Sequence, residues 1–334
     1  MLEVTVEGNT IQIGKHCTIR LERTLRLPDD GKTYPLPPSL GHFPIARIAD
    51  YADRVPEEWR ERGGVFIPMY QSEALWLNFL GHDWHPIAMK VGIGRVNALT
   101  GAPWDHKLRA RPQDYLVCPT QPWLDGINTG DGTIRQFVAM PLGMGYTVEG
   151  QVTGEERLGG IQLVVFDAKK GRFPEENPTP PGLTRRSLVE GAGAFQPLAA
   201  PAGTSMGIAA GGKMKQSIYP DPHGVTTWDE RNRGEIAIHI VNSEQYRAIT
   251  GIAAPPTPVD ASAYTAHGYP WYALYDEAKG DIAPSEALQK VRSVNDLDRE
   301  KGLPQRKEEA SFEVLEEQIR QIGRDRERQL PDKP

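Results

Sequence analysis

The residue types best suited to chemistry lie between Pro119 and Tyr146, a stretch with a tryptophan, two aspartates, an arginine and several glycines. An aromatic side chain beside a carboxylate and a guanidinium is typical of sites that bind sugars or other polar ligands. The sequence therefore predicts a small polar ligand bound by Trp123, Asp125 and Arg135. The alternative is that Trp123 fills the edge of a core and the two charged residues pair or cap turns.

A second candidate is Ser205, in a Gly-Thr-Ser-Met-Gly segment that matches the G-x-S-x-G pattern of hydrolase nucleophiles. That pattern needs a strand before the serine and a helix after it, whereas prolines precede this serine and a glycine pair follows it. Paired acids offer another route to hydrolysis if Asp125, near Trp123, lies close to Glu149 or Glu155. A hydrolase that uses Ser205 or these acids is the alternative function.

Metal and phosphate patterns are incomplete. His82 and His85 are three residues apart, but Pro86 follows at once and no glutamate lies between them as in H-E-x-x-H. A near match to a phosphate-binding loop has Met214 where a serine or threonine would hold magnesium. We therefore favour a structural turn at the two histidines and expect neither a bound metal nor a cofactor.

Composition limits the classes of partner. The 334 residues include 38 Lys and Arg against 44 Asp and Glu, a net charge of -6 without a basic cluster, so nucleic acid is not an expected partner. No apolar run approaches the roughly 18 residues of a membrane span, and the N-terminal residues do not resemble a signal peptide. We expect a cytoplasmic protein without a membrane partner, in which Cys17 and Cys118 are buried free thiols.

Short apolar or alternating runs, separated by Gly, Pro, Asn and Asp, predict antiparallel strands. The expected fold class is α+β, with a β-rich antiparallel body, short helices, long Pro- and Gly-rich loops and a C-terminal amphipathic helix. We expect a β-rich domain over 1–168, a linker over 169–186, a smaller α+β region over 187–300 that packs on the first, and a charged tail over 301–334.

Helices are expected in pieces within residues 51–80, over 243–250 with Ser243 as N-cap and Gly251 as the stop, and over 284–293. The tail from Pro304 predicts the amphipathic helix, because its apolar residues recur at steps of three and four: Phe312, Leu315, Ile319 and Ile322.

Two segments favour self-association. A proline-rich arm over 28–44 cannot join a central strand, yet it carries apolar side chains that need a surface: Tyr34, Leu36, Leu40 and Phe43. The amphipathic tail has the same need. Exchange of such elements between identical subunits usually gives closed symmetry, so we predict a homo-oligomer, either a dimer or a tetramer.

Several segments resemble a family of uncharacterised bacterial proteins over about residues 20–295: "QPWLDGI", "RQFVAMPLGMGYTVEGQVTGEE" with "GGIQLVV", and "GGKMKQSIYPDPHG" with "IHIVNS". The resemblance implies one coherent unit and brings no activity. Some members carry a membrane label that the hydropathy of this chain contradicts. Because each catalytic pattern lacks its required context, we predict a non-catalytic structural or binding protein that acts as a homo-oligomer.

Overall fold

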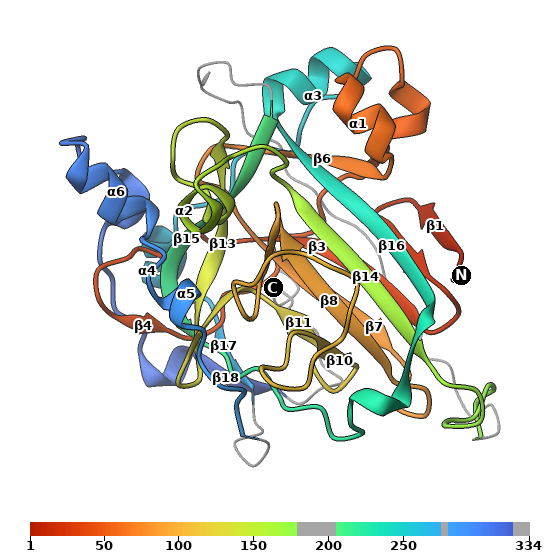
Figure 1. Cartoon of the computed structure of the whole chain (residues 1–334). Helices are drawn as coiled ribbons and strands as arrows, with labels where there is room; N and C mark the ends of the chain where they lie inside the picture. Colours follow the sequence, from red (N-terminus) through yellow and green to blue (C-terminus); the bar gives the residue numbers. More distant parts are fainter. Residues whose placement is uncertain (179–204, 275–279, 323–334) are drawn as a thin grey trace.

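The computed structural model describes residues 1–178, 205–274 and 280–322, and most of its strands join one large, mainly antiparallel sheet (Figure 1). The order of strands across the sheet differs from their order in the chain, so distant segments become neighbours. Across the sheet they are β1 (Val4–Glu7), β2 (Thr10–Ile13), β3 (Cys17–Thr24), β7 (Ala74–Gly81), β13 (Thr133–Pro141), β15 (Ser205–Lys215), β16 (Trp228–Asn242), β14 (Ile161–Ala168), β8 (Ile87–Ile93) and β10 (Leu116–Cys118).

Shorter strands extend this sheet, and a separate parallel pair lies beside it: β4 (Thr33–Tyr34), β5 (Ala46–Arg47), β6 (Val65–Met69), β9 (Val96–Asn97), β11 (Trp123–Leu124) and β12 (Gly126–Gly130), then the pair β17 (Trp271–Leu274) and β18 (Ile319–Ile322). The α-helices are short: α1 (Glu57–Arg62), α2 (Val148–Thr153), α3 (Ser243–Thr250), α4 (Ala261–Ala266), α5 (Glu286–Gln289) and α6 (Val294–Glu300). The predicted β-rich antiparallel body is confirmed, and no helix in the described part of the chain is long and apolar enough to cross a membrane.

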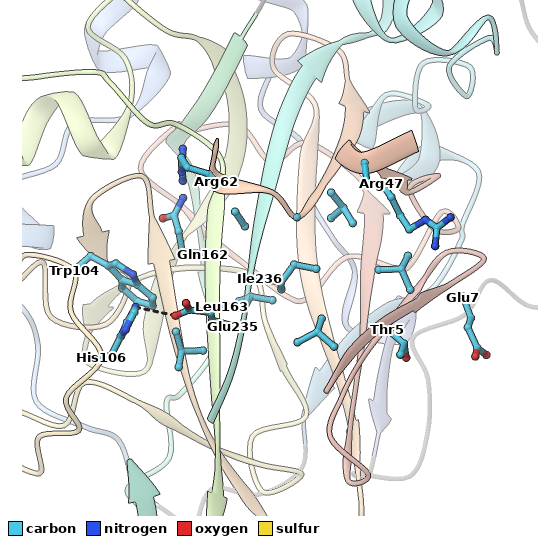
Figure 2. A pocket seen from close by; sticks show the side chains of 17 residues that line it. Thr5, Glu7, Arg47, Arg62, Trp104, His106, Gln162, Leu163, Glu235 and Ile236 are labelled. Carbon is cyan, nitrogen blue, oxygen red and sulfur yellow. Dashed lines mark ion pairs between the residues drawn. The ribbon is translucent and has the colours of Figure 1, made fainter. Parts of the chain in front are cut away.

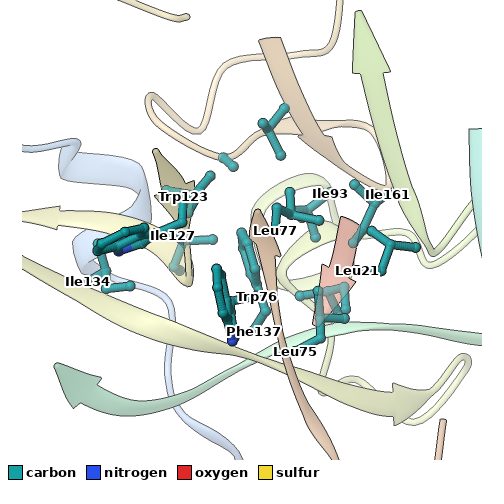
Figure 3. Packing of buried hydrophobic residues seen from close by; sticks show 14 of the residues in the cluster. Leu21, Leu75, Trp76, Leu77, Ile93, Trp123, Ile127, Ile134, Phe137 and Ile161 are labelled. Carbon is teal, nitrogen blue, oxygen red and sulfur yellow. The ribbon is translucent and has the colours of Figure 1, made fainter. Parts of the chain in front are cut away.

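Alternating side chains of the strands build the main core. On β14, Leu163 belongs to this core, while its neighbour Val164 points to the opposite face of the sheet and joins a smaller cluster. Trp76 and Trp123 meet edge to face inside the core, with ring centroids 6.1 Å apart (Figure 3). The outer face of β14 and β16 therefore carries its own, smaller hydrophobic cluster.

Strands β15 and β16, from the predicted region 187–300, pair with β13 and β14 of the predicted domain 1–168. Strands from both sides of the predicted linker 169–186 therefore alternate in one sheet. Residues 179–186 of that linker lie outside the described residues.

The expectation of helix pieces over 51–80 is confirmed for α1 and wrong for residues 74–81, which form β7. Residues Ala74–Phe79 of this strand are all buried. A strand buried on both faces is apolar at consecutive positions, so it loses the alternation that distinguishes a strand from a helix.

The predicted amphipathic helix is absent from residues 304–322, which form short 3₁₀ turns and then β18. Tertiary contacts explain this difference. Glu309 forms a buried ion pair with Arg26, the Phe312 ring lies 4.7 Å from the ring of Tyr34, and β18 pairs with β17. An extended chain reaches these three separate places, and a helix is too compact to do so. Residues 323–334 lie outside the described residues.

The arm over 28–44 packs on its own chain. Tyr34, Leu36 and Phe43 are buried, and Leu36 exchanges two backbone hydrogen bonds of 2.8 and 2.9 Å with Tyr272. Part of the arm, β4, also pairs in parallel with β15. The same molecule therefore supplies the surface that these apolar side chains need.

Candidate functional site

A groove of about 650 Å³ crosses the outer side of β16 (Figure 2). Its floor comes from β14 and β16, one wall from the loop between β9 and β10, and the opposite wall from β1. Arg62, the last residue of α1, and Gly64, from the turn that follows, also line it. Pockets of this size commonly hold small molecules, so this groove is the candidate site.

The register of β14 and β16 sets the floor. Gln162 is opposite Ala237, and Val164 is opposite Glu235. Because side chains alternate along a strand, these four residues point away from the main core. Ala237 has the smallest side chain of the four, which leaves room for the groove to pass over β16.

One wall carries two ring side chains, those of Trp104 and His106. Trp104 lies against Gly92 of β8, where an added Cβ atom would be 2.7 Å from the indole ring. His106 Nε2 is 3.1 Å from Glu235 Oε2, across the groove floor (Figure 2). Both side chains of this ion pair are partly exposed, so it stabilises the wall by about 1 kcal/mol at most.

Buried Lys90 holds this wall in place from below. Its Nζ donates to Asp105 Oδ1 at 2.9 Å, to Lys107 O at 2.6 Å and to Asp114 Oδ2 at 2.9 Å. All three donor positions of the ammonium are therefore used. Hydrogen bonds from Arg109 and Lys90 hold the pKa of Asp105 well below its usual range.

The end of the groove at α1 depends on two successive glycines. Gly63 and Gly64 have φ values of 62° and 88°, a region that favours glycine. A Cβ atom on Gly64 would lie 2.1 Å from the carbonyl oxygen of Ala237. This close approach brings the C-terminus of α1, and with it Arg62, over the groove.

His239 supports the same turn from inside. Its Nε2 lies 3.1 Å from Gly63 O and therefore donates, and its ring stacks on Trp59 with centroids 4.6 Å apart. Burial, with a smaller contribution from the positive charge of Arg62, lowers the pKa of His239 to about 4. The imidazole is therefore neutral near pH 7.

Arg62 has no carboxylate within ion-pairing distance among the described residues. Its Nη1 donates a long hydrogen bond of 3.5 Å to Leu158 O. Burial lowers the pKa of its guanidinium, and the negative charges of Glu149 and Glu58 partly offset that lowering. Arg47, the other arginine of the groove, already makes a two-pronged pair with Asp50, with distances of 2.8 and 2.9 Å. Of the two arginines that line the groove, Arg62 is therefore the one without an ion pair among the described residues.

Gln162 lies between Arg62 and Trp104 (Figure 2). Its Nε2 donates to Gly159 O at 3.1 Å, which fixes the orientation of the amide because a carbonyl only accepts. The other end, Oε1, is buried and has no hydrogen-bond partner. An unsatisfied buried acceptor costs about 1–3 kcal/mol, and a donor group that reached this oxygen would recover part of that cost.

On the far side of β16 the groove has an apolar recess, edged by the polar side chains of Thr5, Glu7 and Arg47 (Figure 2). Ile236 lies there, away from Trp104 and His106 (Figure 2). Val65 of β6 and the half-buried Val4 and Val6 of β1 complete this apolar recess.

The three residues predicted to bind a polar ligand lie elsewhere. Trp123 is in the main core, and Asp125 is fully buried, where its Oδ2 accepts from Gln216 Nε2 at 2.7 Å. Arg135 Nη1 donates to Asp29 Oδ2 at 2.9 Å. Asp125 and Arg135 therefore have different partners, and neither lines the groove.

The groups of the hydrolase alternative are also apart from the groove. Ser205 is the first residue of β15, opposite Val241, and so is not at a strand-to-helix turn. The Glu149 carboxylate accepts from Gly159 N at 2.9 Å, and Glu155 pairs with Arg157 at the surface.

His82 and His85 close a tight turn in which His85 N donates to His82 O at 2.9 Å. Both ring nitrogens of His85 face acceptors, namely Pro174 O at 2.6 Å and Asp167 Oδ1 at 2.8 Å. The ring of buried His16 stacks on that of His85 with centroids 3.8 Å apart.

Ligand atoms of His16, His85 and Glu175 lie within 4.8 Å of one another, which would suit a metal by distance alone. However, the two imidazole planes are only 18° apart, and their nitrogen lone pairs lie in those planes. Two stacked rings do not direct lone pairs at one ion, and a ring rotation would break a hydrogen bond of His85. This arrangement therefore does not fit a metal centre.

Sequence reasoning missed every key group of the groove, although two signals were present. The Gly63–Gly64 pair directly after a short helix indicates a close backbone approach, and Pro103–Trp104 places an aromatic residue in a loop.

In comparisons with protein-family models, curated proteins and solved structures, no match to this chain was found.

Proposed function

We propose that this protein is a non-catalytic binding protein whose groove holds a small organic anion. One observation supports it above the others: Arg62 has a half-buried guanidinium without a carboxylate partner, beside the unpartnered Oε1 of Gln162. A charged hydrogen bond contributes about 1.5–3 kcal/mol, enough for Arg62 to select an anion over a neutral analogue.

The lining of the groove favours binding over catalysis. Among the described residues that line it, none is a serine, cysteine or lysine, the usual nucleophiles. His106 and Glu235 pair with each other and are 37 % and 58 % exposed, so water screens their charges and lowers their value as an acid–base pair.

Isothermal titration calorimetry with acetate, butanoate, benzoate and inorganic phosphate tests this proposal, with butanol as the neutral probe. We expect at least one anion to bind, and Arg62→Met to weaken it about 10- to 100-fold. Arg47→Met is the matched control and should change affinity less than about twofold, because Arg47 already pairs with Asp50. The proposal fails if no anion binds at millimolar concentration or if both variants have the same effect.

We further propose that the chain forms a homo-oligomer. Leu315, from the apolar series of the tail, is 50 % exposed and offers an uncovered surface. Light scattering at micromolar concentration should give a multiple of the chain mass of 37.0 kDa. A mass near that of one chain contradicts self-association.

A further inference from the structure

We infer that the anion is an aliphatic hydroxy acid, bound with its carboxylate at Arg62, its hydroxyl at Gln162 and its chain in the apolar recess. The inference rests on the proposed function and names the ligand class. It follows from three groups that line one groove, each of which selects a different part of the ligand.

The head of the ligand is set by two groups of opposite character. The Arg62 guanidinium donates and is positively charged, so it suits a carboxylate. Gln162 Oε1 only accepts, and the hydrogen bond from its Nε2 to Gly159 O keeps it in that orientation. A plain carboxylate has no donor for this oxygen, whereas a hydroxyl beside the carboxylate supplies one.

The tail of the ligand is set by the recess beyond β16. Val4, Val6, Val65 and Ile236 are aliphatic, and Val65 and Ile236 also belong to the main core, while Thr5, Glu7 and Arg47 form the polar edge of the recess. The four side chains belong to β1, β6 and β16, whose positions are fixed by the sheet. An aliphatic chain that enters this recess loses water contact along its length, and affinity then rises by up to about fourfold for each methylene buried.

Ala237 lies where a chain would cross from the head to the recess. It is half-buried, faces outward from β16, and has Gly64 packed against its carbonyl oxygen. A methyl group and a glycine leave a passage here that a larger side chain at position 237 would close.

The test is calorimetric titration of the full chain with butanoate, octanoate and 2-hydroxyoctanoate. We expect octanoate to bind at least tenfold more tightly than butanoate, and 2-hydroxyoctanoate more tightly still. Gln162→Met, which keeps the length of the side chain but removes the acceptor, should abolish the preference for the hydroxy acid, so that the affinities for octanoate and 2-hydroxyoctanoate become equal.

Ala237→Leu should reduce octanoate affinity to that of butanoate without weakening butanoate. Ala52→Leu, at an exposed position outside the groove, is the matched control and should leave both affinities unchanged. Because Ala237→Leu could disturb the sheet, Val6→Thr serves as a second variant that adds a hydroxyl to the recess at nearly constant volume. It should reduce the ratio of octanoate affinity to butanoate affinity severalfold.

If butanoate, octanoate and 2-hydroxyoctanoate all bound with equal affinity and their binding depended on Arg62, this inference would be overturned and the proposed function would stand. The inference would also be overturned if octanoate bound to Ala237→Leu and Val6→Thr with the same affinity as to the wild type. Failure of every anion to bind would remove the proposed function itself.

Discussion

Acidification should loosen the groove through His239, which is 2 % exposed and supports the Gly63 turn. Its pKa is lowered from 6.5 to about 4, first by burial and then by Arg62. Above pH 6.5 the folded and unfolded chains both carry this imidazole neutral. Between pH 6.5 and 4 the unfolded chain binds a proton that the folded chain does not, so stability falls as the pH falls.

The size of the effect follows from the two pKa values. A gap of about 2.5 pH units at about 1.4 kcal/mol per unit gives a total loss of about 3 kcal/mol, of which about 2 kcal/mol appears between pH 7.5 and pH 5. Below pH 4 both states are protonated, and this contribution stops changing.

The assay is urea unfolding of the wild type and of His239→Gln at pH 7.5, 6 and 5. Glutamine retains an N–H donor for Gly63 O and does not titrate, while all carboxylates titrate equally in both proteins. We expect the wild type to lose about 2 kcal/mol more than the variant between pH 7.5 and 5. His267→Gln, at an exposed histidine, should follow the wild type. Parallel pH profiles for the wild type and His239→Gln would refute the reasoning.

Three further outcomes are expected. Lys90→Met should lower the free energy of unfolding in urea by about 1–3 kcal/mol, because Asp114 loses its buried ammonium partner and keeps only Arg109; an unchanged midpoint would contradict a stabilising role of Lys90 in the wall. Gly64→Ala should lower the free energy of unfolding by about 2 kcal/mol or more, because residue 64 has a φ of 88° and an added Cβ would meet Ala237 O. An unchanged free energy of unfolding would contradict that close approach. A fluorophosphonate probe should not label the wild type at Ser205, and labelling that Ser205→Ala abolishes would revive the hydrolase alternative.

The β-rich antiparallel body could be predicted because hydrophobic alternation and turn residues are local signals. The helix predicted over 243–250 is also confirmed, and its N-cap is Asn242 rather than Ser243, one residue earlier than predicted. The end of this helix at Gly251 is a local signal of the same kind, since this glycine adopts the left-handed conformation.

The failures have a shared physical origin in contacts between distant segments. The tail carries a helical apolar pattern, but its pairing with β17 and the ion pair of Glu309 with Arg26 hold it extended. Likewise, Gln162 reads as an ordinary polar residue of a strand, and only the register with Ala237 places it in a groove. Local periodicity does not determine register or strand order, so the sequence could indicate single features of the groove, such as the Gly63–Gly64 pair, but not their assembly into one site.

The groove is lined from Val4 at one end of the chain to Ala237 more than two hundred residues later, with β6, the loop that carries Trp104 and β14 in between. Because these residues are far apart in the sequence, the groove is complete only after all the strands of the sheet have paired. A bound ligand would therefore act as a tether between the first and last strands of the body, and protect remote amides from hydrogen exchange together with those that it touches. Fragments that lack either β1 or β16 should have no binding activity at all.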